Sequence, residues 1–172
     1  NAAASTLWGF EIDTLFEITE GLRFSAAYSY IDATFDQYLN RDPLLGPGPQ
    51  LSLNGNRLPY VSKHTVNVGL NYEKEIGNGT FSAGVNTSFH SDFFLREFNV
   101  RNLDRVRGNT KTDLTIGYEF GDPGLRISAY VTNLENNVER NNIFLTPGFI
   151  GTNATTTISK PRTIGVRADF TF

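Results

Sequence analysis

The 172-residue sequence predicts an all-β protein, built as an antiparallel transmembrane β-barrel. Three observations indicate this class. Apolar and polar residues alternate in seven segments, the period of strands that expose one apolar face. Short turns and long loops alternate between these segments, as they do in outer-membrane barrels. Aromatic residues make up 13% of the chain and fall near segment ends, as in the girdles at membrane interfaces.

Each of the seven segments places its apolar residues on one parity. The last one shows this most clearly, since Ile164, Val166, Ala168 and Phe170 alternate with small or charged residues. A strand with this pattern has one apolar face and one polar face. The expected strands are 6–18, 21–35, 63–75, 79–92, 109–120, 125–133 and 164–172.

Short and long connections alternate between the expected strands. Thr19-Glu20, the GNG sequence at 77–79 and the GDPG sequence at 121–124 are tight-turn signals. The other connections, residues 36–62, 93–108 and 134–160, are long and rich in Asn, Gly, Pro and Arg. Outer-membrane barrels have short turns in the periplasm and long loops outside the cell, so the pattern predicts this orientation.

The aromatic residues separate a membrane barrel from a soluble β-sandwich, which also alternates. A sandwich core gives aromatic residues no reason to avoid the strand centres, whereas membrane interfaces favour them at both ends. If the odd-numbered strands run toward the short turns, one aromatic belt lies near the turns and the other near the long loops. The turn belt is Phe16, Phe24, Tyr72, Phe81, Tyr118, Phe120, Phe170 and Phe172, and the loop belt is Trp8, Phe10, Tyr28, Tyr30 and Phe89.

Composition excludes several other classes. A net charge of -3 gives no basis for binding nucleic acid. The absence of cysteine excludes disulfides and thiolate metal sites. No apolar stretch reaches the roughly 18 residues of a transmembrane helix. No cofactor is expected.

An odd number of strands does not close a bacterial single-chain barrel, which has an even number. Open strand edges in lipid would leave unpaired backbone groups, each costing several kcal/mol. We therefore expect residues 1–172 to be the last seven strands of a larger barrel, with the remaining strands of the same protein at both edges.

Four stretches together resemble the C-terminal barrel of TonB-dependent outer-membrane receptors. Three are similar to the family's G-x-x-L-P-x-x-P-x-H, x-x-N-L-x-D and x-P-R-x-x-G-x-x-x-x-x-x-F patterns, and Ser62 and Asn136 depart from them. In that order, the stretches are GNRLPYVSKHTVNVGLNYE (55–73), YVTNLENNVE (130–139) and KPRTIGVRADFTF (160–172), and the fourth is YSYIDATF (28–35).

The resemblance implies a 22-stranded barrel around an N-terminal plug, in the outer membrane of a Gram-negative bacterium. It implies active uptake of a ferric siderophore or a similar large nutrient, with energy delivered by TonB through a box ahead of the plug. It also implies contact with outer-membrane lipid and lipopolysaccharide. The strand-end aromatics Phe170 and Phe172 resemble the signal read by the barrel-assembly machinery. A passive, porin-like barrel without a plug is the alternative.

Candidate ligand contacts lie in the long loops. If the alternation of the neighbouring strands continues into the loops, several cationic side chains lie on the lumen side. There, the paired N–H donors of an arginine guanidinium would suit an anionic ferric chelate. Bracing of the loops against Glu97 and Asp104, or contact with lipopolysaccharide phosphates, is the competing interpretation. The candidates are His90, Arg96, Arg101, Arg105 and Arg107, together with Tyr38, Arg57 and Tyr60 from the first loop.

The sequence offers little for metal binding or catalysis. His64 has the lipid parity and His90 is alone on the lumen parity, so neither predicts a metal site. Ser88 and His90 share a face, but no third catalytic group is evident. We therefore predict no enzyme activity, no catalytic residues and no metal site.

Overall fold

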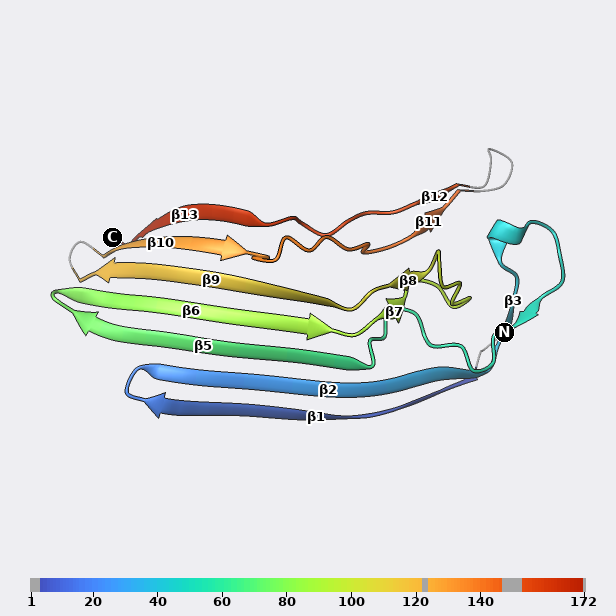
Figure 1. Cartoon of the computed structure of the whole chain (residues 1–172), viewed down its shortest axis with the longest axis horizontal. Coiled ribbons are helices and arrows are strands. Elements are labelled where there is room, and N and C mark those ends of the chain that lie inside the picture. The colour runs from blue at the N-terminus through green and yellow to red at the C-terminus, as the bar shows by residue number, and fades with distance from the viewer. Residues whose placement is uncertain (1–3, 122–123, 147–152, 172) are drawn as a thin grey trace.

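The computed structural model describes residues 4–121, 124–146 and 153–171, and shows one antiparallel sheet with loops at one end (Figure 1). Seven long strands follow each other in the sheet in chain order. The described residues include no apolar helix of membrane-spanning length. The strands are β1 (Ala4–Thr19), β2 (Leu22–Gln37), β5 (His64–Ile76), β6 (Gly79–His90), β9 (Asn109–Phe120), β10 (Leu125–Thr132) and β13 (Thr163–Phe170).

The seven predicted strands are confirmed, with ends that differ by about two residues. In β6 the strand ends at His90, two residues earlier than expected, and Ser91 N–H still donates to the His64 carbonyl at 2.8 Å. The short turns lie at one end of the sheet and the three long loops at the other (Figure 1).

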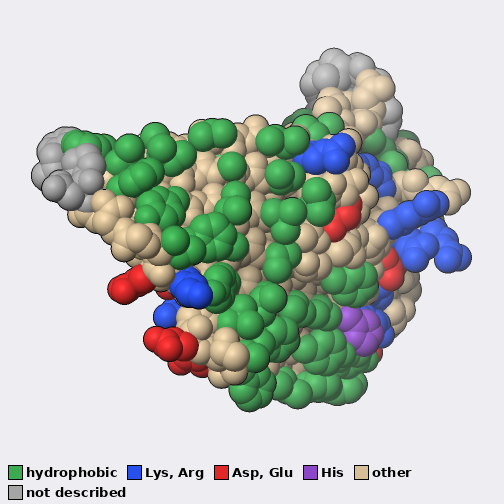
Figure 2. Space-filling view, turned by 60° about the vertical axis from the view of Figure 1, so that its left-hand side comes forward, with side chains coloured by type: hydrophobic (Ala, Val, Ile, Leu, Met, Phe, Trp, Pro, Cys, Tyr) green, Lys and Arg blue, Asp and Glu red, His purple; other side chains and the backbone are tan. Residues whose placement is uncertain are grey.

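The register brings the apolar parities of all strands onto one face. Ile116 on β9, for example, pairs with Ala83 on β6 and Ala129 on β10, and Val66 on β5 pairs with Tyr28 and Phe89. Figure 2 shows apolar side chains spread over this face. Large side chains on it stay exposed in the isolated sheet, including Ile116 at 51% and Val166 at 75%. The face is therefore suited to lipid and not to a protein core.

Both expected aromatic belts lie on this apolar face. At the loop end, Trp8, Phe10, Tyr28 and Tyr30 form a ring cluster with His64, whose ring centroid is 5.1 Å from that of Tyr30. At the turn end, the Tyr118 and Phe120 rings are 4.8 Å apart. Phe172 lies outside the described residues, and Phe170 is half exposed at the end of β13.

The tight turn between β1 and β2 requires glycine. Gly21 has φ 76°, and a Cβ there would lie 2.0 Å from the Glu73 carbonyl oxygen of β5. The Gly21 carbonyl also accepts from Glu73 N–H at 2.8 Å. The turn therefore packs directly on the neighbouring strand.

The three long loops contain short elements that hydropathy did not predict. The first loop (residues 38–63) holds β3 (Leu39–Asn40), the 3₁₀ turn η1 (Pro43–Leu45) and β4 (Leu51–Ser52). The second loop (91–108) pairs β7 (Phe93–Phe94) with β8 (Arg105–Val106), and the third loop (133–162) pairs β11 (Phe144–Leu145) with β12 (Ala154–Thr155).

Most of the buried side chains in the described part of the chain lie at the loop end. They form a small mixed core between the first and second loops, in contrast to the exposed strand faces. Its members are Ala33, Asp42, Leu53, Leu95, Arg96, Asp104 and Val106.

Candidate functional site

Arg96 joins the first and second loops from inside this core. Its Nη1 donates to Asp42 Oδ1 at 2.8 Å and its Nε to Asp104 Oδ1 at 2.7 Å. Arg96 is 7% exposed and Asp104 is fully buried. Burial alone would lower the pKa of Arg96, but its hydrogen bonds to the two aspartates outweigh this and raise it. The guanidinium is therefore fixed in its charged form within the loops.

This position differs from the lumen position that extended strand parity assigned to Arg96. The ladder of β6 ends at His90, so the alternation does not continue to residue 96. The contact with Asp104 is the loop bracing described above as the competing interpretation. Glu97 accepts from Asn40 instead, at 2.9 Å.

A second ion-pair group surrounds Asp92. Arg57 Nη1 and Arg105 Nε reach the same Asp92 oxygen at 3.2 and 3.1 Å. Arg57 also donates to the Val61 and Asp92 carbonyls and lies 5.5 Å from the Phe94 ring centroid. Arg57 is therefore largely committed to holding the first loop on the second.

The third loop is fixed to the sheet by Glu139. Its carboxylate contacts His90 Nε2 at 2.7 Å and forms an ion pair with Lys111. Burial alone would raise the pKa of Glu139, but hydrogen bonds with Lys111, Asn109 and His90 hold it below its usual value. His90 Nδ1 faces the Ser91 carbonyl at 2.9 Å, so both ring nitrogens face oxygen atoms.

Between the second and third loops lies a polar hollow of about 550 Å³, lined by residues 105–110 and 137–140. Arg107 is exposed at its edge and makes no ion pair with any described residue. Arg140 donates to the carbonyls of Leu103 and Arg105 at 2.5 and 2.7 Å, contacts that do not neutralise its charge. We call this feature the cationic hollow.

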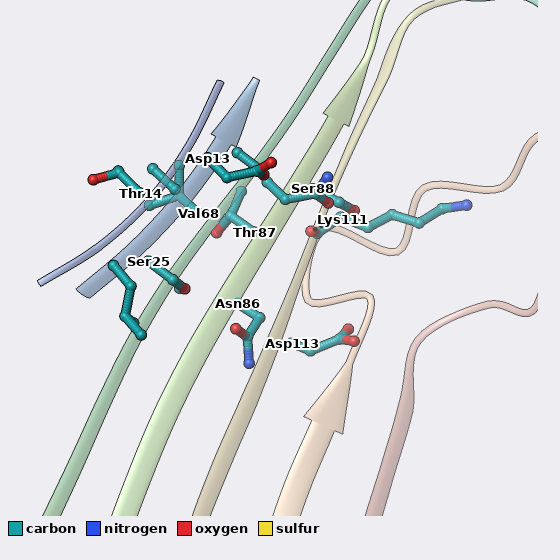
Figure 3. Close-up of a pocket in the computed structure, with 14 residues that line it drawn as sticks. Asp13, Thr14, Ser25, Val68, Asn86, Thr87, Ser88, Lys111 and Asp113 are labelled. Atoms are coloured by element: carbon teal, nitrogen blue, oxygen red, sulfur yellow. Dashed lines mark hydrogen bonds between the residues drawn. The ribbon is translucent and has the colours of Figure 1, made fainter. Parts of the chain in front are cut away.

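The polar face of the sheet continues below the loops. A shallow cavity of about 590 Å³ lies over β1, β2, β5, β6 and β9. Figure 3 shows Ser25, Asn86 and Asp113 over this part of the sheet, while the Lys111 side chain extends away from Asn86 and Asp113. The mixture of hydroxyl, amide and charged groups matches the wet lumen expected from the sequence.

The remaining candidates have different environments. Arg101 is exposed without an ion pair in the described structure. Tyr38 accepts from Asn40 Nδ2 at 3.0 Å and its ring is 4.8 Å from that of Phe35. Tyr60 is 55% exposed and has φ 61°, in the left-handed region.

Sequence reasoning missed Glu139, Arg140 and Asp42, on which the loop arrangement depends. They lie outside the strands, where no periodicity indicates a side chain's direction. Asn133 was also missed, although it has φ 55° and donates to the carbonyls of Asn137 and Lys160. The Asn-rich sequence after residue 132 was the one available signal, because Asn tolerates this conformation.

The described residues contain no group of three or more His, Asp or Glu side chains arranged to hold a metal ion. The hydroxyl of Ser88 donates to the Lys111 carbonyl at 3.4 Å and not to His90. His90 itself pairs with Glu139. Ser88 and His90 therefore do not form a nucleophile and base pair.

An antiparallel sheet with a lipid-suited face, a polar face, short turns and braced loops defines part of a transmembrane β-barrel. Comparison with known proteins gives the family: residues 1–134 match the model of the TonB dependent receptor-like β-barrel. The chain belongs to this family, whose members are transporters of the Gram-negative outer membrane. The predictions of the family and of the outer membrane are confirmed, and the members of this family are transporters, not enzymes.

Solved structures of this class are similar in fold. The ferric yersiniabactin uptake receptor FyuA from Yersinia pestis has a TM-score of 0.77 at 17% identity, over 98% of this chain and 24% of that one. The siderophore receptor PiuA from Acinetobacter baumannii has a TM-score of 0.74 at 19% identity, over 98% and 22%.

The ferric citrate transporter FecA in its unliganded form has a TM-score of 0.66 at 20% identity, over 97% of this chain and 25% of that one. The chain thus spans about a quarter of the length of these receptors. A search of curated proteins found no match.

Proposed function

We propose that the chain is part of an outer-membrane active transporter that takes up a ferric siderophore or a similar anionic chelate. The observation that supports this proposal is the cationic hollow between the second and third loops. The structural neighbours named as receptors for ferric chelates agree with it, although likeness at 17–20% identity concerns the fold alone.

The charges around the hollow favour an anion. Glu139 forms an ion pair with Lys111, and Asp92 is shared between Arg57 and Arg105. Arg107 and Arg140 have no carboxylate partner among the described residues, so they leave a net positive charge. Guanidinium groups donate in a fork that matches carboxylate and catecholate oxygens.

We propose that the seven strands are part of a 22-stranded barrel. Among the described residues, β1 and β13 have no partner on their outer edges, and such edges are unstable in lipid. The remaining strands would pair there, and a plug would contact the polar face. TonB would then supply energy through the plug.

The membrane-facing partners follow from the same placement. Lipid would cover the apolar face, and lipopolysaccharide would surround the loop-end aromatic belt. The barrel-assembly machinery would recognise the end of β13, whose last residue is Phe170. Phe170→Ala should lower the amount of receptor in the outer membrane, and unchanged levels would argue against this role.

The cationic hollow can be tested by ligand binding to the full-length receptor. Arg107→Ala should weaken binding of ferric citrate, used as an anionic probe, by about tenfold, since a hydrogen bond to a charged group contributes ~1.5–3 kcal/mol. Arg101→Ala, another exposed arginine of the second loop, is the matched control and should change binding by less than about twofold. Equal effects of both substitutions would refute the site.

Active transport has a separate test. Uptake of a labelled ferric chelate by cells with the full-length receptor should stop when TonB is deleted, while surface binding remains. Uptake that continues without TonB would support the passive, porin-like alternative.

A further inference from the structure

Tyr60 adopts a backbone conformation that its side chain disfavours. It is the third residue of a turn from Leu58 to Val61, after Pro59, and its φ is 61°. This turn position with positive φ favours Gly or Asn. The other non-glycine residues with positive φ in the described structure are all asparagines: Asn99, Asn133 and Asn136. Tyr60 is thus the bulky exception.

The surrounding segments impose this conformation. Tyr60 N–H donates to the Phe94 carbonyl at 2.8 Å, and Leu58 N–H to the Ala33 carbonyl at 3.0 Å. Arg57 N–H donates to Asn99 Oδ1 at 2.8 Å. A strained residue persists where its surroundings determine its geometry, and such residues concentrate at binding sites.

The Tyr60 ring is exposed in the first loop, at the loop end of the sheet. It is 55% exposed, and its hydroxyl makes no hydrogen bond to a described residue. Its centroid is 6.2 Å from that of Phe93, which in turn is 5.4 Å from that of His90 on the polar parity. The three rings form a row from the exposed loop surface to the polar face of the sheet.

The short strands β7 and β8 connect this row of rings to the cationic hollow. Phe93 on β7 pairs with Val106 on β8, and Val106 lines the hollow. The exposed Tyr60 ring and the partly buried Phe93 ring therefore belong to the same group of loops as the cationic hollow. Flat rings bind by stacking on aromatic side chains, and anionic oxygens bind to guanidinium groups.

We propose that Tyr60 and Phe93 form a platform for the flat aromatic part of the cargo, which is an aryl chelate with catecholate or phenolate oxygens. This inference rests on the proposed uptake of a ferric chelate and narrows its chemical class. Carboxylate and hydroxamate chelates without an aryl ring would use the hollow but gain nothing from the platform.

The test measures binding to the full-length receptor of three probes: the ferric complex of dihydroxybenzoylglycine, a ferric hydroxamate and ferric citrate. Tyr60→Asn removes the ring but suits the turn, and should weaken binding of the aryl probe by about tenfold, as expected for the loss of one stacking contact. Tyr60→Phe keeps the ring and should change it by less than about twofold. Phe93→Leu should resemble Tyr60→Asn.

Hydrogen exchange separates a binding role from a purely structural one. Asn accepts positive φ, so amides 57–61 in Tyr60→Asn should be protected at least as well as in the wild type. Loss of this protection together with weaker binding of every probe would overturn the platform. The platform would also be overturned if the wild type bound the two non-aryl probes but did not bind the aryl probe. That result would leave the proposed function standing. Failure of all three probes to bind the wild type would overturn both.

Discussion

The strand end and the loop end of this chain are stabilised in opposite ways. In the strands, large apolar side chains such as Ile116 and Val166 are exposed, and the backbone ladder holds the sheet together. In the loops, a small core is buried, and charged side chains such as Arg96 and Asp104 lie inside it. The strands are organised for lipid, and the loops resemble a small water-soluble domain.

This difference shows where binding specificity can change without loss of the barrel. A strand position is constrained by its parity and its depth in the membrane. A loop position is constrained by a few named partners, so residues outside these networks, such as Arg101 and Arg107, can be substituted without breaking a described loop contact. Four substitutions test the contrast.

Arg96→Ala should have the largest effect, confined to the loops. It leaves Asp42 and Asp104 buried without their cation, and breaking a buried pair typically costs ~3–5 kcal/mol. Hydrogen exchange on the full-length receptor should show loss of protection in the first and second loops, with the strands unchanged. Retained protection would show that the triad does not join the loops.

Ile116→Lys should destabilise the strand region by ~2–4 kcal/mol, since it places a charge on the lipid face at mid-strand. Thr115→Lys, one residue away on the polar parity, is the matched control and should be tolerated. The measurement is the free energy of unfolding of the full-length receptor from lipid vesicles. Similar losses for both variants would contradict the assignment of the two faces.

Glu139→Gln should loosen the third loop at neutral pH, by ~1.5–3 kcal/mol for the lost charged hydrogen bonds. Because the pKa of Glu139 in the folded chain lies below the ordinary 4.5, its contribution is complete above that pH. The contribution disappears as the pH falls through the lowered value. Protection of the third loop should therefore decline in acid in the wild type, and less so in Glu139→Gln.

The control for this substitution is Glu97→Gln, which removes a carboxylate that accepts from Asn40 and does not contact the third loop in any described interaction. It should leave the acid response of the third loop unchanged. An unchanged acid response in Glu139→Gln as well would assign the response to other groups.

Tyr118→Phe should have the smallest effect, because it removes one hydrogen bond at the turn end. The Tyr118 hydroxyl donates to the Ile76 carbonyl at 2.5 Å and joins β9 to the end of β5. We expect a loss of ~0.5–1.5 kcal/mol in unfolding from vesicles. Tyr72→Phe is the control, because the Tyr72 hydroxyl makes no hydrogen bond to a described residue. An equally large loss of unfolding free energy in Tyr72→Phe would show that the Tyr118 hydrogen bond does not stabilise the sheet.

Much of the strand region could be predicted from the sequence, because a period of two fixes both the element and the face of each residue. The same rule placed Arg96 wrongly, since β6 ends at His90 and no ladder carries the alternation further. Glu139 could not be predicted to meet His90, 49 residues away, because only the folded third loop brings them together. The position of Tyr60 in a candidate site was predicted, but its strained backbone was not.

The central claim is that alternate residues of these strands face lipid and a wet lumen. The chain has no cysteine, so single cysteines along β9, at 113–118 in an otherwise cysteine-free receptor, can report it in the outer membrane. Water-soluble thiol reagents should label positions 113, 115 and 117, and a lipid-dissolved quencher should reach probes at 114, 116 and 118. Equal access of the water-soluble reagent to both sets would contradict the account.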